Sequence, residues 1–99
     1  MTTVSPPPPL PDPPDGFARE IQELVDATAP RVFAVVEEYA VGGLRDAQVA
    51  AWGLAYEDGS ADVAAVGGGF RMSVTAPDRA ARFVSLRPGS LGSVVWPGT

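Results

Sequence analysis

QVAAWGLAYEDG, residues 48–59, is predicted to form a β-strand that runs into a tight turn. Because side chains alternate between the two faces of a strand, this strand should have two unlike faces. One face carries the large side chains of Trp52, Leu54 and Tyr56. The other carries only small or medium side chains, namely Val49, Ala51, Gly53 and Ala55. We therefore expect a bulky apolar layer on one side and, on the other, a helix or a second subunit close to the backbone of Gly53.

Several further strands are expected around this one. Asp58-Gly59 favours a tight hairpin turn into a strand at 61–66, and a run of three glycines favours a turn into a strand at 70–75. The second of these strands alternates cleanly, with apolar Phe70, Met72 and Val74 on one face. A last strand is expected at 91–96.

Residues 31–39 fit two interpretations. The segment is rich in β-branched residues and follows Pro30, which favours a strand. The apolar residues also recur at helical spacing, so a helix is the alternative. We favour the strand.

Two helices are expected to accompany the sheet. Phe17, Ile21, Leu24 and Val25 recur at i, i+4, i+7 and i+8, which predicts an amphipathic helix that ends near Thr28. A shorter helix should begin at Pro77 and stop before Pro88-Gly89. The predicted fold is α+β, with the N-terminal helix packed on an antiparallel sheet of four to five strands and the short second helix before the last strand. Residues 15–99 form this single domain, and the Pro-rich residues 1–14 form a disordered tail.

The composition excludes several classes of chemistry. The 99 residues include no Cys and no His, so there is no disulfide, no thiolate nucleophile and no imidazole base or metal ligand. A net charge of −5 argues against a nucleic-acid partner, which would require clustered cations. No apolar run approaches the length of a membrane span, so no membrane partner is expected and the cytoplasm is the expected location.

No motif in the chain predicts an enzyme, a cofactor or a metal site. The glycine run 67–69 lacks the residues that complete a phosphate-binding loop, and the acids around Asp58 lack the spacing of a calcium loop. Glu37 and Glu38 are adjacent on the expected strand and should point to opposite faces, so they cannot act on one substrate atom. Glu38 is the only acid we would nominate for catalysis, as a carboxyl group whose pKa burial would raise.

Three segments carry a resemblance to known proteins. WGLAYED at 52–58, FRMSV at 70–74 and APDRAARF at 76–83 together resemble a group of small uncharacterised actinobacterial proteins, and the similarity covers residues 17–86. The resemblance implies a bacterial cytoplasmic setting. It places no active-site residue on any position of this chain.

The function expected from these observations is that of a small, acidic, non-enzymatic interaction or regulatory protein that acts through protein–protein contacts. Two alternatives remain open: a small-ligand-binding protein with an apolar pocket lined by Trp52, Leu54 and Tyr56, and an immunity-type inhibitor of a basic partner. The same three residues and Trp96 are the expected interface or pocket residues. Because they form a larger apolar surface than a monomer usually exposes, a symmetric homodimer is expected.

Overall fold

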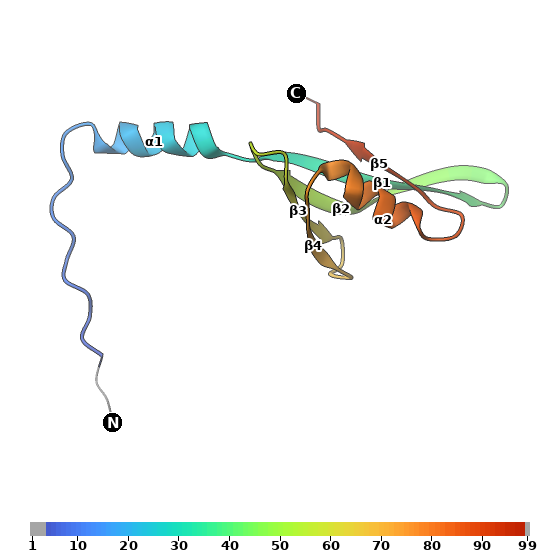
Figure 1. Cartoon of the computed structure of the whole chain (residues 1–99), viewed down its shortest axis with the longest axis horizontal. Helices are drawn as coiled ribbons and strands as arrows, with labels where there is room; N and C mark the ends of the chain where they lie inside the picture. Colours follow the sequence, from blue (N-terminus) through green and yellow to red (C-terminus); the bar gives the residue numbers. More distant parts are fainter. Residues whose placement is uncertain (1–3, 99) are drawn as a thin grey trace.

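Five antiparallel strands form one sheet, in the order β4-β3-β2-β1-β5 (Figure 1). The structure is a computed structural model that describes residues 4–98. Along the chain the elements are α1 (Phe17–Thr28), β1 (Arg31–Val41), β2 (Leu44–Ala55), β3 (Ala61–Ala65), β4 (Arg71–Val74), α2 (Pro77–Ser85) and β5 (Leu91–Val95). The α+β fold, the antiparallel sheet and the short helix before the last strand are therefore confirmed.

The ambiguous segment forms β1, the strand between β2 and β5. Its β-branched side chains suit the pleated surface of a sheet, which favours the strand over the helix. A turn at Gly42 and Gly43 connects it to β2, and both glycines adopt positive φ, at 58° and 81°. Glycine has no Cβ and reaches this region without strain, so it permits the tight reversal between the two longest strands.

One face of the sheet, the covered face, packs against α2 and contains the core. Phe33, Val35, Ala51 and Val63 contribute from the strands, and α2 contributes Ala80, Ala81 and Val84. Gly53 lies directly opposite Phe33 on the neighbouring strand, and a Cβ at Gly53 would overlap the Phe33 ring. The close approach expected at Gly53 is present, but a side chain of the adjacent strand makes it, in place of the expected helix or second subunit.

A second glycine brings α2 close to β5. A Cβ at Gly92 would overlap the carbonyl oxygen of Ala81, so only glycine permits this approach of the helix backbone. The Gly92 N–H donates to Ser85 Oγ at 2.8 Å, and the Ser85 hydroxyl donates to the Ala81 carbonyl at 2.9 Å. The serine therefore links the last turn of α2 to β5.

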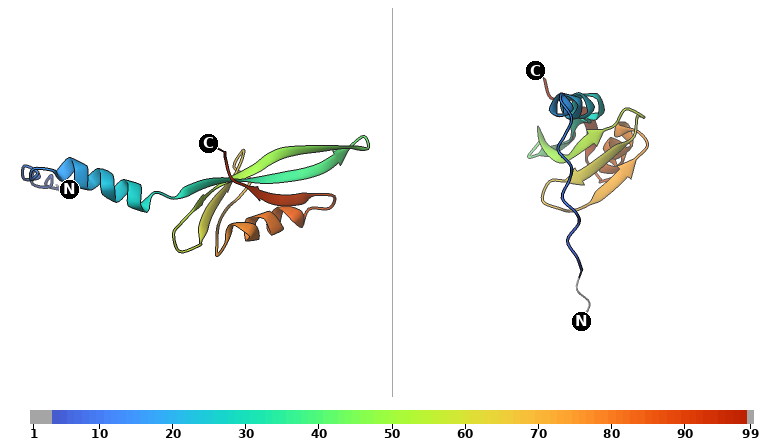
Figure 2. Two further views of the ribbon diagram at one scale, coloured as in Figure 1. Left: turned by 90° about the horizontal axis from the view of Figure 1, so that it is seen from above. Right: turned by 90° about the vertical axis from the view of Figure 1, so that its left-hand side faces the viewer.

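Helix α1 does not pack on the sheet, contrary to the prediction. All of its residues are exposed, and it extends away from the end of β1 (Figures 1 and 2). The physical reason lies in the connection. Ala29 is extended, with φ −60° and ψ 126°, and Pro30 follows it, so the chain leaves the helix without reversing. Residues 4–14, before α1, form no helix or strand and are exposed.

Candidate functional site

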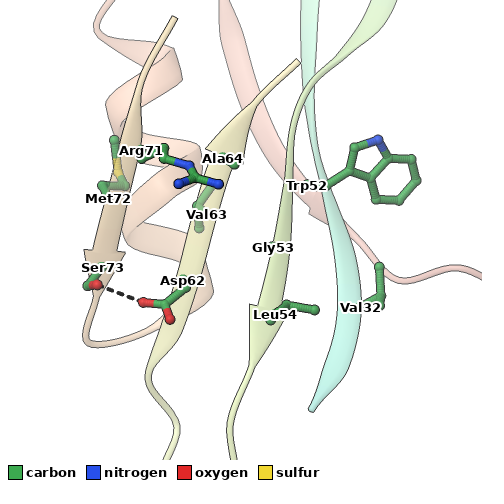
Figure 3. A pocket seen from close by; sticks show the side chains of 10 residues that line it. All are labelled: Val32, Trp52, Gly53, Leu54, Asp62, Val63, Ala64, Arg71, Met72 and Ser73. Atoms are coloured by element: carbon green, nitrogen blue, oxygen red, sulfur yellow. Dashed lines mark hydrogen bonds between the residues drawn. The ribbon is translucent and has the colours of Figure 1, made fainter. Parts of the chain in front are cut away.

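The sheet face opposite α2 is not covered by another element of residues 4–98. Direct cross-strand partners share a face, so the strand register defines two rows of side chains across the sheet. The first row is Val95, Ala34, Trp52, Ala64 and Arg71, and the second is Val32, Leu54, Asp62 and Ser73. We call these two rows, with Tyr56 beside them, the open face. Figure 3 shows the part of it that extends from Val32 and Trp52 to Arg71 and Ser73.

The centre of the open face is apolar and partly exposed. Val32 and Trp52 are each 47% exposed, Leu54 is 40% exposed and Tyr56 is 38% exposed. Val32, Trp52 and Leu54 border a shallow groove of about 690 Å³ that runs over β2 and β3 toward Arg71 (Figure 3). The open face thus offers large apolar side chains along a shallow, open groove.

Asp62 organises the polar side of the groove. Its carboxylate accepts hydrogen bonds from the Ser73 hydroxyl at 2.6 Å and from the Tyr56 hydroxyl at 2.8 Å. These hydrogen bonds, first that of Ser73 and then that of Tyr56, hold the pKa of Asp62 below its ordinary value. The hydrogen bond to Asp62 raises the pKa of Tyr56. The arrangement fixes the Tyr56 ring at the edge of the apolar patch.

Arg71 adds a positive charge at the end of the first row. The ion pairs within residues 4–98 join Arg45 to Glu38 and Arg87 to Glu37, so Arg71 has no acidic partner in the described part of the chain. The open face can therefore offer a guanidinium group to an acidic group of a ligand or partner.

The structure brings together three of the four predicted interface or pocket residues. Trp52, Leu54 and Tyr56 lie on the open face, whereas Trp96 lies on the covered side. The Trp96 ring contacts Phe33, with centroids 5.2 Å apart, and the Arg31 guanidinium lies 4.4 Å from the centre of the Trp96 ring. The register of β5 explains this position, because Val94 pairs with Val35 on the covered face and Trp96 follows two residues later.

The two adjacent glutamates point to opposite faces, as expected, but their environments differ from those the sequence suggested. Glu38 is partly exposed and lies 4.0 Å from Arg45, so burial does not isolate it as a catalytic acid. Glu37 is 5% exposed and was not predicted as a site residue. Its apolar neighbours on the strand could have indicated burial, although its bonding partners could not be recognised from the sequence.

Glu37 links three parts of the covered side. It accepts hydrogen bonds from the Ser90 hydroxyl at 2.6 Å and from Gln48 Nε2 at 2.9 Å, and Arg87 lies 3.6 Å away. The hydrogen bond from Ser90 makes the largest contribution to lowering the pKa of Glu37, and the hydrogen bond from Gln48 and the charge of Arg87 lower it further. Burial has the opposite effect but does not outweigh them. Both carboxylate oxygens are bound within the fold, which assigns Glu37 a structural role.

Neither a protein-family model, nor a curated protein, nor a solved structure matches the chain. Within residues 4–98, no cluster of three or more acidic side chains could hold a metal ion. None of the helices in this part of the chain has the length and apolar character to cross a membrane.

Proposed function

We propose that the protein is a non-enzymatic interaction or regulatory protein that binds another protein chain through its open face. One observation carries the proposal: Val32, Trp52 and Leu54 form a continuous apolar patch, about half exposed, on a sheet face that no helix within residues 4–98 covers. Exposed apolar patches of this kind, bordered by polar groups, are typical of protein-binding surfaces. We further propose a bacterial cytoplasmic setting, as the resemblance implies.

The composition of the patch supports a protein partner. Trp and Tyr are enriched among the residues that contribute most to binding energy at interfaces. Tyr56 is already held by Asp62, so little side-chain entropy would be lost when a partner packs against its ring. The groove is shallow and open, which suits a protein surface better than a small molecule that must be enclosed.

The test compares Leu54→Glu with Leu86→Glu. Leu86 is also exposed but lies at the end of α2, away from the open face, so it provides a matched control. Each full-length variant is immobilised and incubated with lysate of the source cells, and captured proteins are identified by mass spectrometry. We expect a specific set of proteins, or additional copies of the chain, to be lost with Leu54→Glu and retained with Leu86→Glu. Identical capture by both variants would refute the proposal.

A small-ligand-binding function is the second candidate. The groove volume of about 690 Å³ lies within the range of known ligand sites. Arg71 beside an apolar patch would select a ligand with an apolar body and an acidic group. Trp52 borders the groove, so titration with apolar carboxylic acids should quench tryptophan fluorescence in the wild type and not in Arg71→Ala.

The third candidate is an immunity-type inhibitor of a basic partner, supported by the net charge of −5. Association with such a partner would accelerate at low salt, because opposite charges steer the encounter. An association rate independent of ionic strength would exclude it.

A further inference from the structure

We propose that helix α1 of a second copy of this chain covers the open face, and that two copies exchange their α1 helices in a two-fold symmetric dimer. The inference rests on the proposed function, since it names the occupant of the same surface. Each protomer would lay its α1 on the open face of its partner. The proposal follows from two apolar surfaces that have no packing partner within residues 4–98.

The first of these surfaces is the apolar side of α1. Phe17, Ile21, Leu24 and Val25 lie along one side of the helix and are 39 to 62% exposed. Isolated helices shorter than about 12–15 residues are marginal in water, and α1 has 12 residues. Most helical stability in proteins comes from packing of the apolar side. A folded α1 therefore requires a surface to pack on.

The connection to β1 opposes packing of α1 on its own sheet. A tight reversal after a helix commonly uses a residue in the left-handed conformation directly after it, usually Gly. Here the C-cap is Ala29, which Pro30 restricts to extended conformations, and the next position is Pro30 itself, whose ring fixes φ at about −65° and excludes the left-handed conformation. Strand pairing begins at once, with Arg31 opposite Ala55. The chain is thus built to hold α1 away from its own open face.

The dimensions of the two surfaces match. A helix of 12 residues is about 18 Å long. The four strands β1 to β4 span about 14 Å at a spacing of about 4.8 Å. A large aromatic side chain presents about 150–250 Å². With the exposed fractions given above, two equal contacts would bury on the order of 1,500 Å² in total, the size of a standard specific interface.

The charges are also complementary. Helix α1 carries three acidic residues, Glu20, Glu23 and Asp26, and one arginine, Arg19. Of the acids, Glu20 lies beside the apolar side of the helix. The open face presents Arg71 at the end of its first row, without an acidic partner in the described residues. Its one acid, Asp62, already accepts hydrogen bonds from Tyr56 and Ser73, so Arg71 is the charged group of this face that is free to pair with an acid of α1. A two-fold axis forms both helix-on-sheet contacts at once and closes the assembly at two copies.

The test is a complementation experiment with two full-length variants. Leu24→Glu places a charge on the apolar side of α1, and Leu54→Glu places one on the open face. Light scattering at micromolar concentration should give a dimer mass for the wild type and for the control Leu86→Glu. Each variant alone should be monomeric, because both of its contacts contain a buried charge. An equimolar mixture should form heterodimers, since the α1 of Leu54→Glu can still bind the open face of Leu24→Glu.

Each other outcome overturns a defined part of the inference. A monomeric wild type would refute the helix exchange while leaving the open face available for a different protein, which the lysate experiment tests. A dimer that Leu54→Glu disrupts and Leu24→Glu does not would indicate contact between two open faces and refute α1 as the occupant. A dimer that survives Leu54→Glu would refute both the exchange and the use of the open face.

A crosslinking experiment avoids charged substitutions in case a variant fails to fold. The natural chain has no cysteine, so Leu24→Cys and Leu54→Cys each introduce a single thiol. Mild oxidation of the mixed variants should yield a disulfide between the thiol introduced at position 24 of one chain and the thiol introduced at position 54 of the other. Mass spectrometry of peptides would detect this crosslink. A mixture of Leu86→Cys with Leu54→Cys is the control and should crosslink several-fold less. Equal yields in the two mixtures would overturn the inference.

Discussion

At the scale of single residues, Gly53 leaves the space that the Phe33 ring occupies. Gly53→Val should destabilise the protein by about 1–3 kcal/mol, because the added side chain overlaps the ring in a packed core. This cost should exceed the intrinsic preference of valine for strands. Urea denaturation measures the change in the free energy of unfolding.

Gly69→Val is the matched control. A Cβ at Gly69 would meet only Ala65 Cβ, at an ordinary 3.9 Å, and its φ is not in the positive range. We expect this control to lie within about 0.5 kcal/mol of the wild type. Equal stabilities for the two variants would contradict the packing of Phe33 over Gly53.

Glu37 should make stability depend on pH in the acid range. Its folded-state pKa is lowered from an ordinary value of 4.5, so its stabilising contribution is complete above that value. The contribution is lost as the pH falls from about 4.5 through the lower folded-state pKa. Glu37→Gln should be less stable at neutral pH and should lose less stability on acidification, as followed by thermal melting between pH 7 and pH 3.

Asp58 and Asp62 also have lowered pKa values, so some acid dependence should remain in Glu37→Gln. Glu23→Gln, at an exposed position on α1, is the control and should follow the wild-type profile. A Glu37→Gln profile parallel to that of the wild type would contradict the role assigned to the buried carboxylate.

At this scale the sequence predicted a close approach at Gly53 but not the group that makes it. The opposition of Phe33 to Gly53 depends on the register of β1 with β2, which shifts at a bulge between Val35 and Val36. A shift of this kind changes which residues face each other and leaves no signal in either strand's own pattern. The partners of Glu37 were equally hidden, because Ser90 is 53 residues away in the chain.

At the scale of elements, the periodic patterns predicted both helices and all five strands. These patterns report local geometry, and they do not specify what each apolar side packs against. Helix α1 has the expected amphipathic pattern and yet lies off the sheet, because Ala29 and Pro30 direct it away. Trp96 lies on the opposite side from Trp52 because β5 joins the sheet beside β1, a pairing that the sequence did not reveal.

The packing of α2 against β5 gives a prediction at the same scale. Gly92→Ala should displace α2, because the new methyl group overlaps the backbone carbonyl of Ala81, which cannot rotate away. We expect a loss of about 1–3 kcal/mol, the range found for overpacked cores. Gly98→Ala, where a Cβ meets nothing within 4 Å, is the control. Chemical denaturation of both variants would test the prediction, and a Gly92→Ala protein as stable as its control would contradict it.

At the scale of the whole molecule, the segment before α1 contributes little packing. Residues 4–13 are exposed and form no helix or strand, whereas the Pro14 carbonyl accepts the Phe17 N–H at 3.1 Å. Deletion of residues 1–13 should therefore leave the melting temperature nearly unchanged. A loss of more than about 1 kcal/mol, the size of a typical destabilising substitution, would show that the tail supports the fold.

The position of β1 between β2 and β5 has a consequence for the order of folding. β2, β3 and β4 follow β1 through short turns, so the hairpin contacts can form early at little entropic cost. β5 must return across more than half of the chain to reach β1, and contacts between distant residues slow folding. Docking of α2 and β5 should thus be the late step. Until it occurs, Phe33 and Val35 lack their cover, and the early hairpin sheet is the species most exposed to aggregation.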